Sequence, residues 1–203
     1  MPMDEIERPR YSLRPMLLVL LLPLALIVAN PVSWPEKSWP HELMEWSGYL
    51  LAIIGAYMQI YATVFTSSGE LATAGPYSVV RHPSYIGLLV MMTGIGLETA
   101  SLPLVAFALA IAVPICLWQA RREEIEMLGR FGVRYAKYQE RVRAWLPRLQ
   151  LWDEISEVAA KPRTVMDSML RNSALLMLYP IFEITHMLHQ ANVLQTFTFT
   201  SMP

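Results

Sequence analysis

Two short segments of this 203-residue chain contain side chains that could do chemistry together. The first is Arg81-His82-Pro83-Ser84-Tyr85, and the second is the pair Glu123-Glu124. A guanidinium, an imidazole, a phenol and the unpaired N–H groups at a helix start suit an anion such as a carboxylate or phosphate. A carboxylate instead accepts hydrogen bonds from sugar hydroxyls or pairs with an ammonium or sulfonium cation. If both segments face one compartment, they can form a joint site.

Each segment also has an interpretation without catalysis. Arg81 could bind lipid headgroups, His82 could cap the helix that follows it, and Tyr85 could belong to an aromatic belt. Glu123-Glu124 could be a solvated helix extension with surface salt bridges. Neighbours on a helix point about 100 degrees apart, so the two carboxylates are not expected to address one ligand atom in the same way. The residues alone leave both interpretations open.

The composition predicts an all-α integral membrane protein. The chain is 54% hydrophobic and only 16% charged, with a mean hydropathy of +0.34, which is more apolar than a soluble domain of this length. Cys116 is the single cysteine, so the chain can form neither an internal disulfide nor a cysteine-based metal site.

Apolar runs predict four membrane spans, at about residues 16–29, 46–65, 84–97 and 102–118. The basic residues before the first run are also typical of a signal peptide. We expect this run to be retained, because Ile27-Val28-Ala29 places a bulky residue where cleavage prefers a small one. The Pro- and Trp-rich residues 30–44 predict an exposed loop with aromatics at the membrane interface.

The fourth span is predicted to continue as a helix beyond the membrane, through Leu128, and to end at Gly129 or Gly132. Residues 133–145 then predict a basic amphipathic helix on the membrane surface. Its apolar residues recur at three- and four-residue spacing: Tyr135, Tyr138, Val142 and Trp145.

The basic residues predict the topology. They concentrate on the side that holds the N-terminus, Arg81 and everything after residue 120, so this side is expected to be cytoplasmic. The two candidate segments then face the same compartment at similar depth. Residues 1–149 are predicted to form the membrane core. Residues 150–203 are predicted to be an extension that contains an interfacial helix or a marginal fifth span.

Two further patterns are assigned to structure rather than to ligands. Gly94-Ile95-Gly96 lies inside a span with no strand before it, which favours helix packing over a nucleotide loop. Glu183, His186 and His189 recur every three residues, but no second helix offers matching ligands. We therefore predict a polar face there and no metal site.

The candidate residues resemble a known superfamily when they are taken in order. They are Gly75-Pro76-Tyr77, Arg81-His82-Pro83-Ser84-Tyr85-Ile86-Gly87, Glu123-Glu124, Phe131-Gly132, Tyr135, Tyr138 and Trp145-Leu146-Pro147. This combination, over about residues 45–148, resembles the isoprenylcysteine carboxyl methyltransferase and phospholipid methyltransferase superfamily. The resemblance implies an integral membrane enzyme that uses S-adenosylmethionine without a Rossmann domain.

The resemblance also implies roles for individual residues. A cofactor site would be formed by His82, Tyr85, Glu123, Glu124, Tyr135 and Tyr138. Within it, His82 and Tyr85 would hold the methionine end, and Glu123 or Glu124 would contact the ribose or the amino group. Arg81 would lie near the transferred methyl group and orient an anionic nucleophile. Arg81 and Glu123 are therefore the predicted catalytic residues.

The expected function is methyl transfer to a lipophilic acceptor, such as an isoprenylcysteine carboxylate. A prenylcysteine, a phospholipid amine and a quinol are not separated by the sequence. The expected partners are a lipophilic or prenylated substrate and membrane lipids, and no nucleic acid. Two alternatives stay open: an NADPH-dependent membrane sterol-type reductase, which more often has Asn where this chain has Ser84, and a non-catalytic membrane assembly protein of the same fold.

Overall fold

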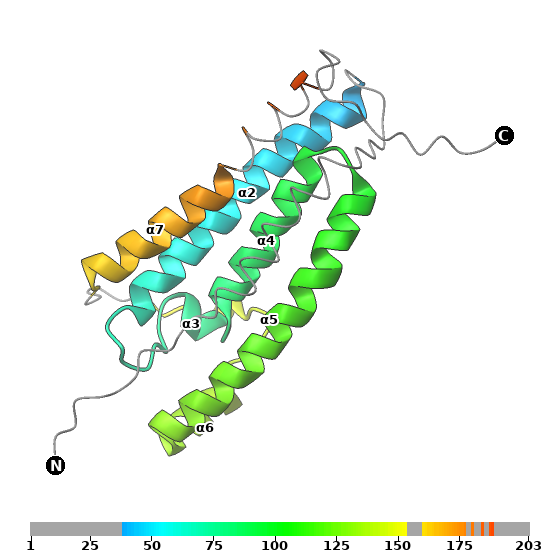
Figure 1. Cartoon of the computed structure of the whole chain (residues 1–203). Helices are drawn as coiled ribbons and strands as arrows, with labels where there is room; N and C mark the ends of the chain where they lie inside the picture. Colours follow the sequence, from blue (N-terminus) through cyan, green and yellow to red (C-terminus); the bar gives the residue numbers. More distant parts are fainter. Residues whose placement is uncertain (1–37, 154–159, 178–179, 181–183, 185–186, 189–203) are drawn as a thin grey trace. The chain divides into compact units, whose positions relative to one another are not determined.

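The computed structural model describes residues 38–153 and 160–177, together with positions 180, 184, 187 and 188. Helices account for all regular structure in these ranges, and no strand occurs in them, which confirms the all-α part of the prediction (Figure 1). The elements are α2 (Trp39–Thr66), α3 (Pro76–Val79), α4 (Pro83–Glu98), α5 (Leu102–Phe131), α6 (Val133–Arg141), the 3-10 helix η1 (Leu149–Leu151) and α7 (Pro162–Leu176). All of them belong to one compact unit, Pro31–Ile184.

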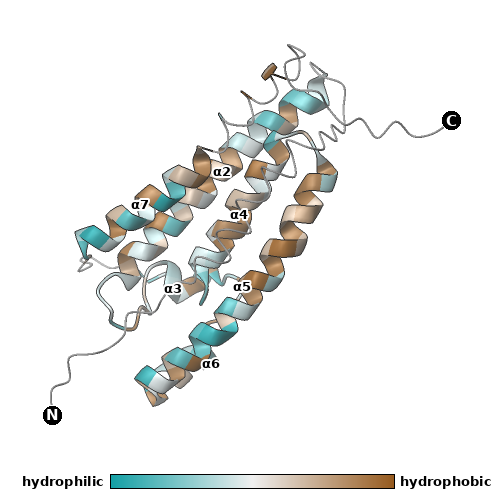
Figure 2. Cartoon of the chain, viewed as in Figure 1, coloured by the Kyte–Doolittle hydropathy of each residue, from teal (hydrophilic) through white to brown (hydrophobic). Residues whose placement is uncertain are grey.

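Three of the expected spans correspond to described helices. The helices α2 and α5 are long and apolar enough to cross a membrane, and α4 is a shorter apolar helix of 16 residues (Figure 2). The expected first span, at residues 16–29, lies outside the described residues, as do Glu183, His186 and His189. Two membrane-crossing candidates and a third apolar helix support a membrane protein.

The start of α2 differs from the prediction. Residues 39–44 were expected in a loop, but the helix already begins at Trp39. Pro40 lies in its first turn, where a missing N–H group removes no helical hydrogen bond, so the proline starts the helix instead of preventing it. Trp39 and Trp46 are 77% and 71% exposed on this first part of α2.

Glycines bring α2 and α4 into close contact. A Cβ atom built on Gly55 would collide with the backbone of Met91, and one built on Gly94 would collide with the backbone of Ala52. Only glycine allows the two backbones to approach so closely. This confirms that Gly94 serves helix packing, and it fixes α4, whose first residue follows His82, against α2.

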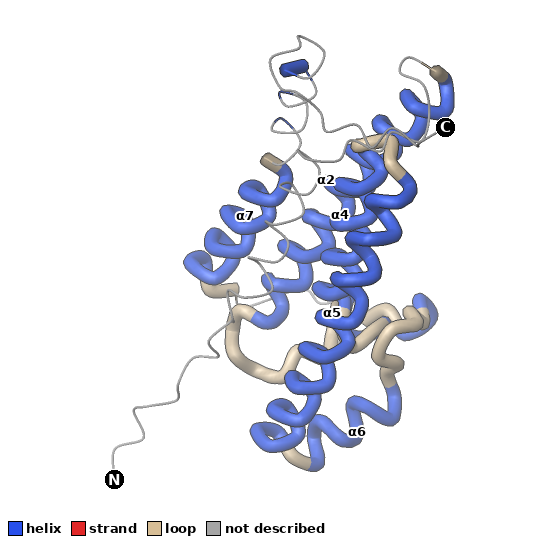
Figure 3. The backbone as a smooth tube through the Cα atoms, turned by 45° about the vertical axis from the view of Figure 1, so that its right-hand side comes forward, coloured by secondary structure: helices blue, strands red, loops and turns tan. Residues whose placement is uncertain are grey.

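The helix α5 packs along α4 and is continuous from Leu102 to Phe131, with Pro114 inside it (Figure 3). Its buried residues recur every four positions: Leu104, Ala108, Ala112, Cys116 and Ala120. The predicted extension beyond the apolar run is confirmed. Gly132, with φ of 53°, ends the helix, whereas Gly129 lies inside it. The extension carries Glu123-Glu124 on the same rigid element as the apolar segment.

The environment of α6 corrects the predicted surface helix. The helix ends at Arg141, so Val142 and Trp145 lie beyond it, and Val142 is extended. Its apolar side chains pack inside the protein rather than on a membrane: Tyr135, Tyr138 and Val142 are buried against Leu71, Met127 and Phe131. The physical reason is the break at Gly132, whose backbone lets α6 turn back and pack on α5 (Figure 3).

The C-terminal helix α7 packs along α2. The hydroxyls of Thr63 and Ser168 lie 3.1 Å apart, and the Lys161 N–H donates to Ser67 Oγ at 3.0 Å. Leu175 and Leu176 pack against the apolar cluster between α2 and α4. The helix begins at Pro162, well before the leucine-rich residues on which the prediction of a C-terminal helix was based.

Candidate active site

The segment before α4 has a fixed backbone. Gly75 adopts φ of 57°, and a Cβ atom there would collide with the ring of Phe65, so the position requires glycine. The buried Ser78 hydroxyl donates to the Gly75 carbonyl at 2.7 Å and closes the short helix α3. The main chain of Arg81, two residues after the end of α3, therefore has a well-defined position.

A second segment, residues 143–153, hydrogen-bonds to residues 78–81 of the segment before α4, and we call it the strap. The Arg81 N–H donates to the Arg143 carbonyl at 2.9 Å, and the Arg148 N–H donates to the Val79 carbonyl at 3.0 Å. The Asp153 N–H donates to the Ser78 hydroxyl at 3.1 Å. These bonds use the main chain on at least one side, so residue type and spacing could not predict them.

His82 stands immediately before α4 and is only 4% exposed. His82 is the N-cap residue of α4, as that interpretation requires, but its side chain makes no capping hydrogen bond. Its ring faces the α5 extension instead. Nε2 lies 3.0 Å from Glu124 Oε1, and Nδ1 lies 3.9 Å from Glu123 Oε2.

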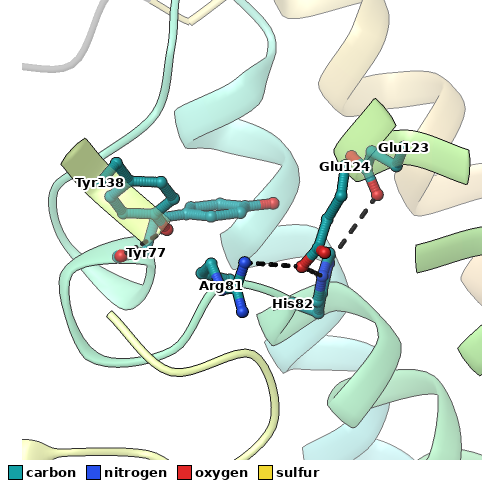
Figure 4. Close-up of polar contacts among 6 residues, drawn as sticks. All are labelled: Tyr77, Arg81, His82, Glu123, Glu124 and Tyr138. Carbon is teal, nitrogen blue, oxygen red and sulfur yellow. Dashed lines mark hydrogen bonds and ion pairs between the residues drawn. The ribbon is translucent and has the colours of Figure 1, made fainter. Parts of the chain in front are cut away.

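Glu124 joins the two candidate segments. Its Oε1 atom lies 2.8 Å from Arg81 Nη1 and 3.0 Å from His82 Nε2, so one oxygen accepts from both (Figure 4). The Glu124 side chain is 23% exposed and that of Arg81 is 15% exposed, which places the ion pair inside the protein rather than at lipid headgroups. The predicted joint site is therefore brought together by the fold.

Glu123 lies at the open side of the cluster. Its side chain is 44% exposed and reaches His82 only at 3.9 Å. The difference between the two carboxylates follows from the rotation of about 100 degrees between neighbours on a helix. Glu124 is engaged inside the protein, and Glu123 keeps acceptor capacity for a ligand.

Aromatic rings lie on both sides of His82. The Tyr85 ring centroid is 5.7 Å from that of His82, and the Trp145 centroid is 5.4 Å away. Tyr85 was among the predicted site residues, whereas Trp145 had no predicted role in the site. The sequence signals for Trp145 were its place on the apolar face of the predicted surface helix and in the Trp145-Leu146-Pro147 element of the resemblance. The strap thus brings an aromatic ring to the site as well as hydrogen bonds.

Tyr135 and Tyr138 lie next to each other, with ring centroids 5.8 Å apart. The Tyr138 hydroxyl donates to the Tyr77 carbonyl at 2.7 Å, which ties α6 to α3 (Figure 4). Burial, with a smaller effect of the Glu124 charge, raises the pKa of Tyr135 to about 12, against the opposing effect of Arg81. Burial also raises the pKa of Tyr138. Both phenols are therefore protonated donors at neutral pH.

The donor set fits S-adenosylmethionine. The more open carboxylate, Glu123, offers acceptor oxygens to a sulfonium or ammonium cation, while Glu124 pairs with the Arg81 guanidinium. The Nε atom of Arg81 is buried and has no hydrogen-bond partner among the described residues, which suits an additional anionic group. In the same described part of the chain, no group of three or more His, Cys, Asp and Glu side chains could hold a metal ion.

Comparisons with known proteins bear on the same segment. Residues 44–134 match the family model of phospholipid methyltransferases. The cobalt-zinc-cadmium resistance protein CzcN of Cupriavidus metallidurans is 28% identical over 179 residues, which cover 85% of this chain and 80% of that protein. The nickel-cobalt-cadmium resistance protein NccN of Alcaligenes xylosoxydans is 30% identical over 129 residues, 62% of this chain and 60% of that protein. No solved structure matches the chain.

The family match covers both halves of the joint site, Arg81-His82-Pro83-Ser84-Tyr85 and Glu123-Glu124, and ends just before Tyr135. It bears out the resemblance noted from the sequence. Residues 44–134 of this chain are thus similar to the phospholipid methyltransferase family, which lies within the isoprenylcysteine and phospholipid methyltransferase superfamily.

Proposed function

We propose that this protein is a membrane-embedded methyltransferase that uses S-adenosylmethionine to methylate a lipophilic acceptor. The observation that carries the proposal is the position of Glu124 Oε1, 2.8 Å from Arg81 and 3.0 Å from His82. This contact assembles the polar residues of two distant segments at one point, within the part of the chain that matches a methyltransferase family.

The cofactor would supply an electrophilic methyl group on a positively charged sulfur. Glu123, the more open carboxylate, would accept hydrogen bonds from the ribose hydroxyls or the amino group. His82 and Tyr85 would hold the methionine end. The two carboxylates would also favour a sulfonium cation over its neutral product.

The main contribution of the protein to catalysis is positioning, because methyl transfer requires an in-line approach of the nucleophile. Arg81 suits this role, since Glu124 and the Arg143 carbonyl fix its side chain and main chain. Its remaining N–H groups would orient an anionic nucleophile.

The position of His82 favours an acceptor that is already an anion. A carboxylate or thiolate needs no general base, whereas an amine or phenol does. His82 Nε2 is engaged by Glu124 Oε1 at 3.0 Å, whereas Nδ1 lies 3.9 Å from Glu123 Oε2, beyond hydrogen-bond distance. A histidine with Nε2 engaged and Nδ1 beside a carboxylate is less suited to accept a proton from a substrate. We therefore favour a lipophilic carboxylate, as in an isoprenylcysteine, over a phospholipid amine.

The site is proposed to face the cytoplasm, from which the water-soluble cofactor would enter, while the acceptor would arrive from the bilayer. The two relatives are named for resistance to cobalt, zinc, cadmium and nickel. By analogy, we propose that the methylated product of this chain also contributes to metal resistance. Growth in the presence of cobalt or cadmium, with wild type or the Glu124→Gln variant, measures this contribution.

Calorimetry on the detergent-purified protein tests the activity. S-adenosylhomocysteine is expected to bind, and the double variant Glu123→Gln with Glu124→Gln is expected to abolish binding. Glu126→Gln, an exposed carboxylate on the same helix, is the matched control and should bind normally. Binding of NADPH instead would support the reductase, and binding of neither ligand would support an assembly protein.

A further inference from the structure

The extension of α5 has a second, outward face that the proposed reaction does not use. With about 100 degrees between neighbours, Ala120, Glu124 and Phe131 share the face toward the protein. The adjacent face, centred about 100 degrees around the helix axis, is exposed. We call it the outer α5 patch, and it consists of Leu117, Trp118, Arg121, Arg122, Ile125 and Leu128.

The patch is apolar and basic at once. Ile125 is 72% exposed, Trp118 is 54% exposed and Leu128 is 40% exposed. The Arg122 guanidinium lies 4.9 Å from the centroid of the Trp118 ring. Among the described residues, the ion pairs of α5 involve Glu123 and Glu124 only, and neither Arg121 nor Arg122 lies within ion-pair distance of a carboxylate there.

The patch continues the exposed apolar side of the membrane-crossing segment, on which Phe107, Val113 and Leu117 lie. A helix rises about 1.5 Å per residue, so Trp118 lies roughly 24 Å, Arg122 roughly 30 Å and Leu128 roughly 39 Å along α5 from Leu102. A bilayer has a hydrocarbon core of about 30 Å and a total thickness of about 40–45 Å. A helix that enters the core near Leu102 therefore carries the two arginines to headgroup depth. In Figure 2, α5 correspondingly changes from mostly hydrophobic to hydrophilic toward α6.

We propose that the outer α5 patch binds the headgroups of anionic phospholipids in the leaflet on the side of the active site. Arg121 and Arg122 contact the phosphates, and Trp118, Ile125 and Leu128 lie at the boundary with the acyl chains. A second copy of the chain is a poorer occupant, because a two-fold contact through this patch would bring the arginines of both copies together.

The selectivity for anionic lipid follows from charge. Each arginine near an anionic surface contributes about 1 kcal/mol, which is about fivefold in affinity. A zwitterionic headgroup offers no such net attraction. The patch would also fix the rotation of α5 about its axis, and thus the direction of Glu124 on the adjacent face, whether or not the site transfers methyl groups.

Native mass spectrometry of the full chain tests the proposal, with phosphatidylglycerol and phosphatidylcholine as the two probes. Wild type is expected to retain phosphatidylglycerol at least about fivefold over phosphatidylcholine. Arg121→Gln with Arg122→Gln should lose this preference. Arg134→Gln with Lys137→Gln, which removes the same charge from α6, should keep it.

Equal retention of the two lipids by wild type would overturn the proposal, as would unchanged preference in the Arg121 and Arg122 variant. If that variant does not fold, Arg121→Gln and Arg122→Gln are made singly, and each should weaken the preference; two single variants with the wild-type preference would overturn the proposal. Quenching of Trp118 fluorescence by brominated phosphatidylglycerol, taken as wild type minus Trp118→Phe, must also occur. A dimer cross-linked through Ile125 in lipid would assign the patch to a second copy instead.

Discussion

The Nη1 atom of Arg81 lies 2.8 Å from Oε1 of Glu124, so an arginine before α4 and a carboxylate near the end of α5 form one unit. The same oxygen is 3.0 Å from His82 Nε2. Through these contacts, the segment just before α4 is joined to α5 by charged side chains as well as by the apolar packing of the two helices.

This connection predicts non-additive effects of mutation. Arg81→Gln or Glu124→Gln alone leaves a largely buried charge without its partner and should destabilise the protein by about 1–3 kcal/mol. The double variant should cost clearly less than the sum of the two. Thermal unfolding in detergent measures all three. Additive losses would mean that the two side chains do not interact in solution.

The position of His82 predicts a binding defect rather than loss of a base. His82→Asn should weaken the affinity for S-adenosylhomocysteine and raise KM for the cofactor, with a smaller effect on kcat, because the ring orients the two carboxylates. Calorimetry and saturation of labelled-methyl transfer provide the two quantities. A large fall in kcat with unchanged affinity would instead assign proton transfer to His82.

The electrostatic environment of Tyr135 predicts an alkaline titration. Its pKa of about 12 exceeds the ordinary value of 10, so the fold favours the neutral phenol. The resulting stability is present below pH 10 and is lost as the pH rises through 12. The tyrosinate absorbance of wild type minus Tyr135→Phe should therefore have its midpoint near pH 12.

Glu124→Gln should lower that midpoint, because the Glu124 charge contributes to the shift. Tyr57→Phe, at a 66% exposed position on α2, is the control and should leave the part of the tyrosinate titration near pH 12 unchanged. A midpoint near pH 10 would show that Tyr135 is not buried beside Glu124.

The close approach of α2 and α4 predicts opposite effects of the same substitution at two helical glycines. Gly55→Ala places a methyl group against the Met91 backbone and should destabilise the protein by about 1–3 kcal/mol. Gly129→Ala, inside α5 with nothing within 4 Å of its Cβ position, should stabilise it by about 0.5–1 kcal/mol. Thermal unfolding compares them directly. A stabilising Gly55→Ala would contradict the observed contact between the helices.

Local rules were sufficient to predict the parts of the fold that depend on one helix at a time. Pro83 sets the start of α4 and leaves His82 outside it, and the absence of a breaker carries α5 through Glu123-Glu124. The distribution of basic residues predicted that these two segments face the same side of the membrane. These predictions used periodicity, charge and helix termini, which are properties of neighbouring residues.

The packing of α6 and the position of Trp145 depend on tertiary contacts, so the sequence alone did not predict them. The pattern of Tyr135, Tyr138 and Val142 fits both a membrane surface and a protein interior, and the break at Gly132 selects the interior. Trp145 reaches His82 only because the strap hydrogen-bonds to residues 78–81. Main-chain pairing of this kind leaves no trace in residue type, so the sequence could not predict it.

The strap also determines when the site can form during synthesis. The family-matched segment ends at residue 134, yet the Arg81 N–H, the Val79 carbonyl and the Ser78 hydroxyl also form hydrogen bonds with residues 143–153. A nascent chain that has just released Glu123-Glu124 from the ribosome thus still lacks the carbonyl that holds Arg81 and the ring that packs on His82. The apolar helices can enter the bilayer first, and ligand-binding competence follows only when the last turn of the strap has emerged.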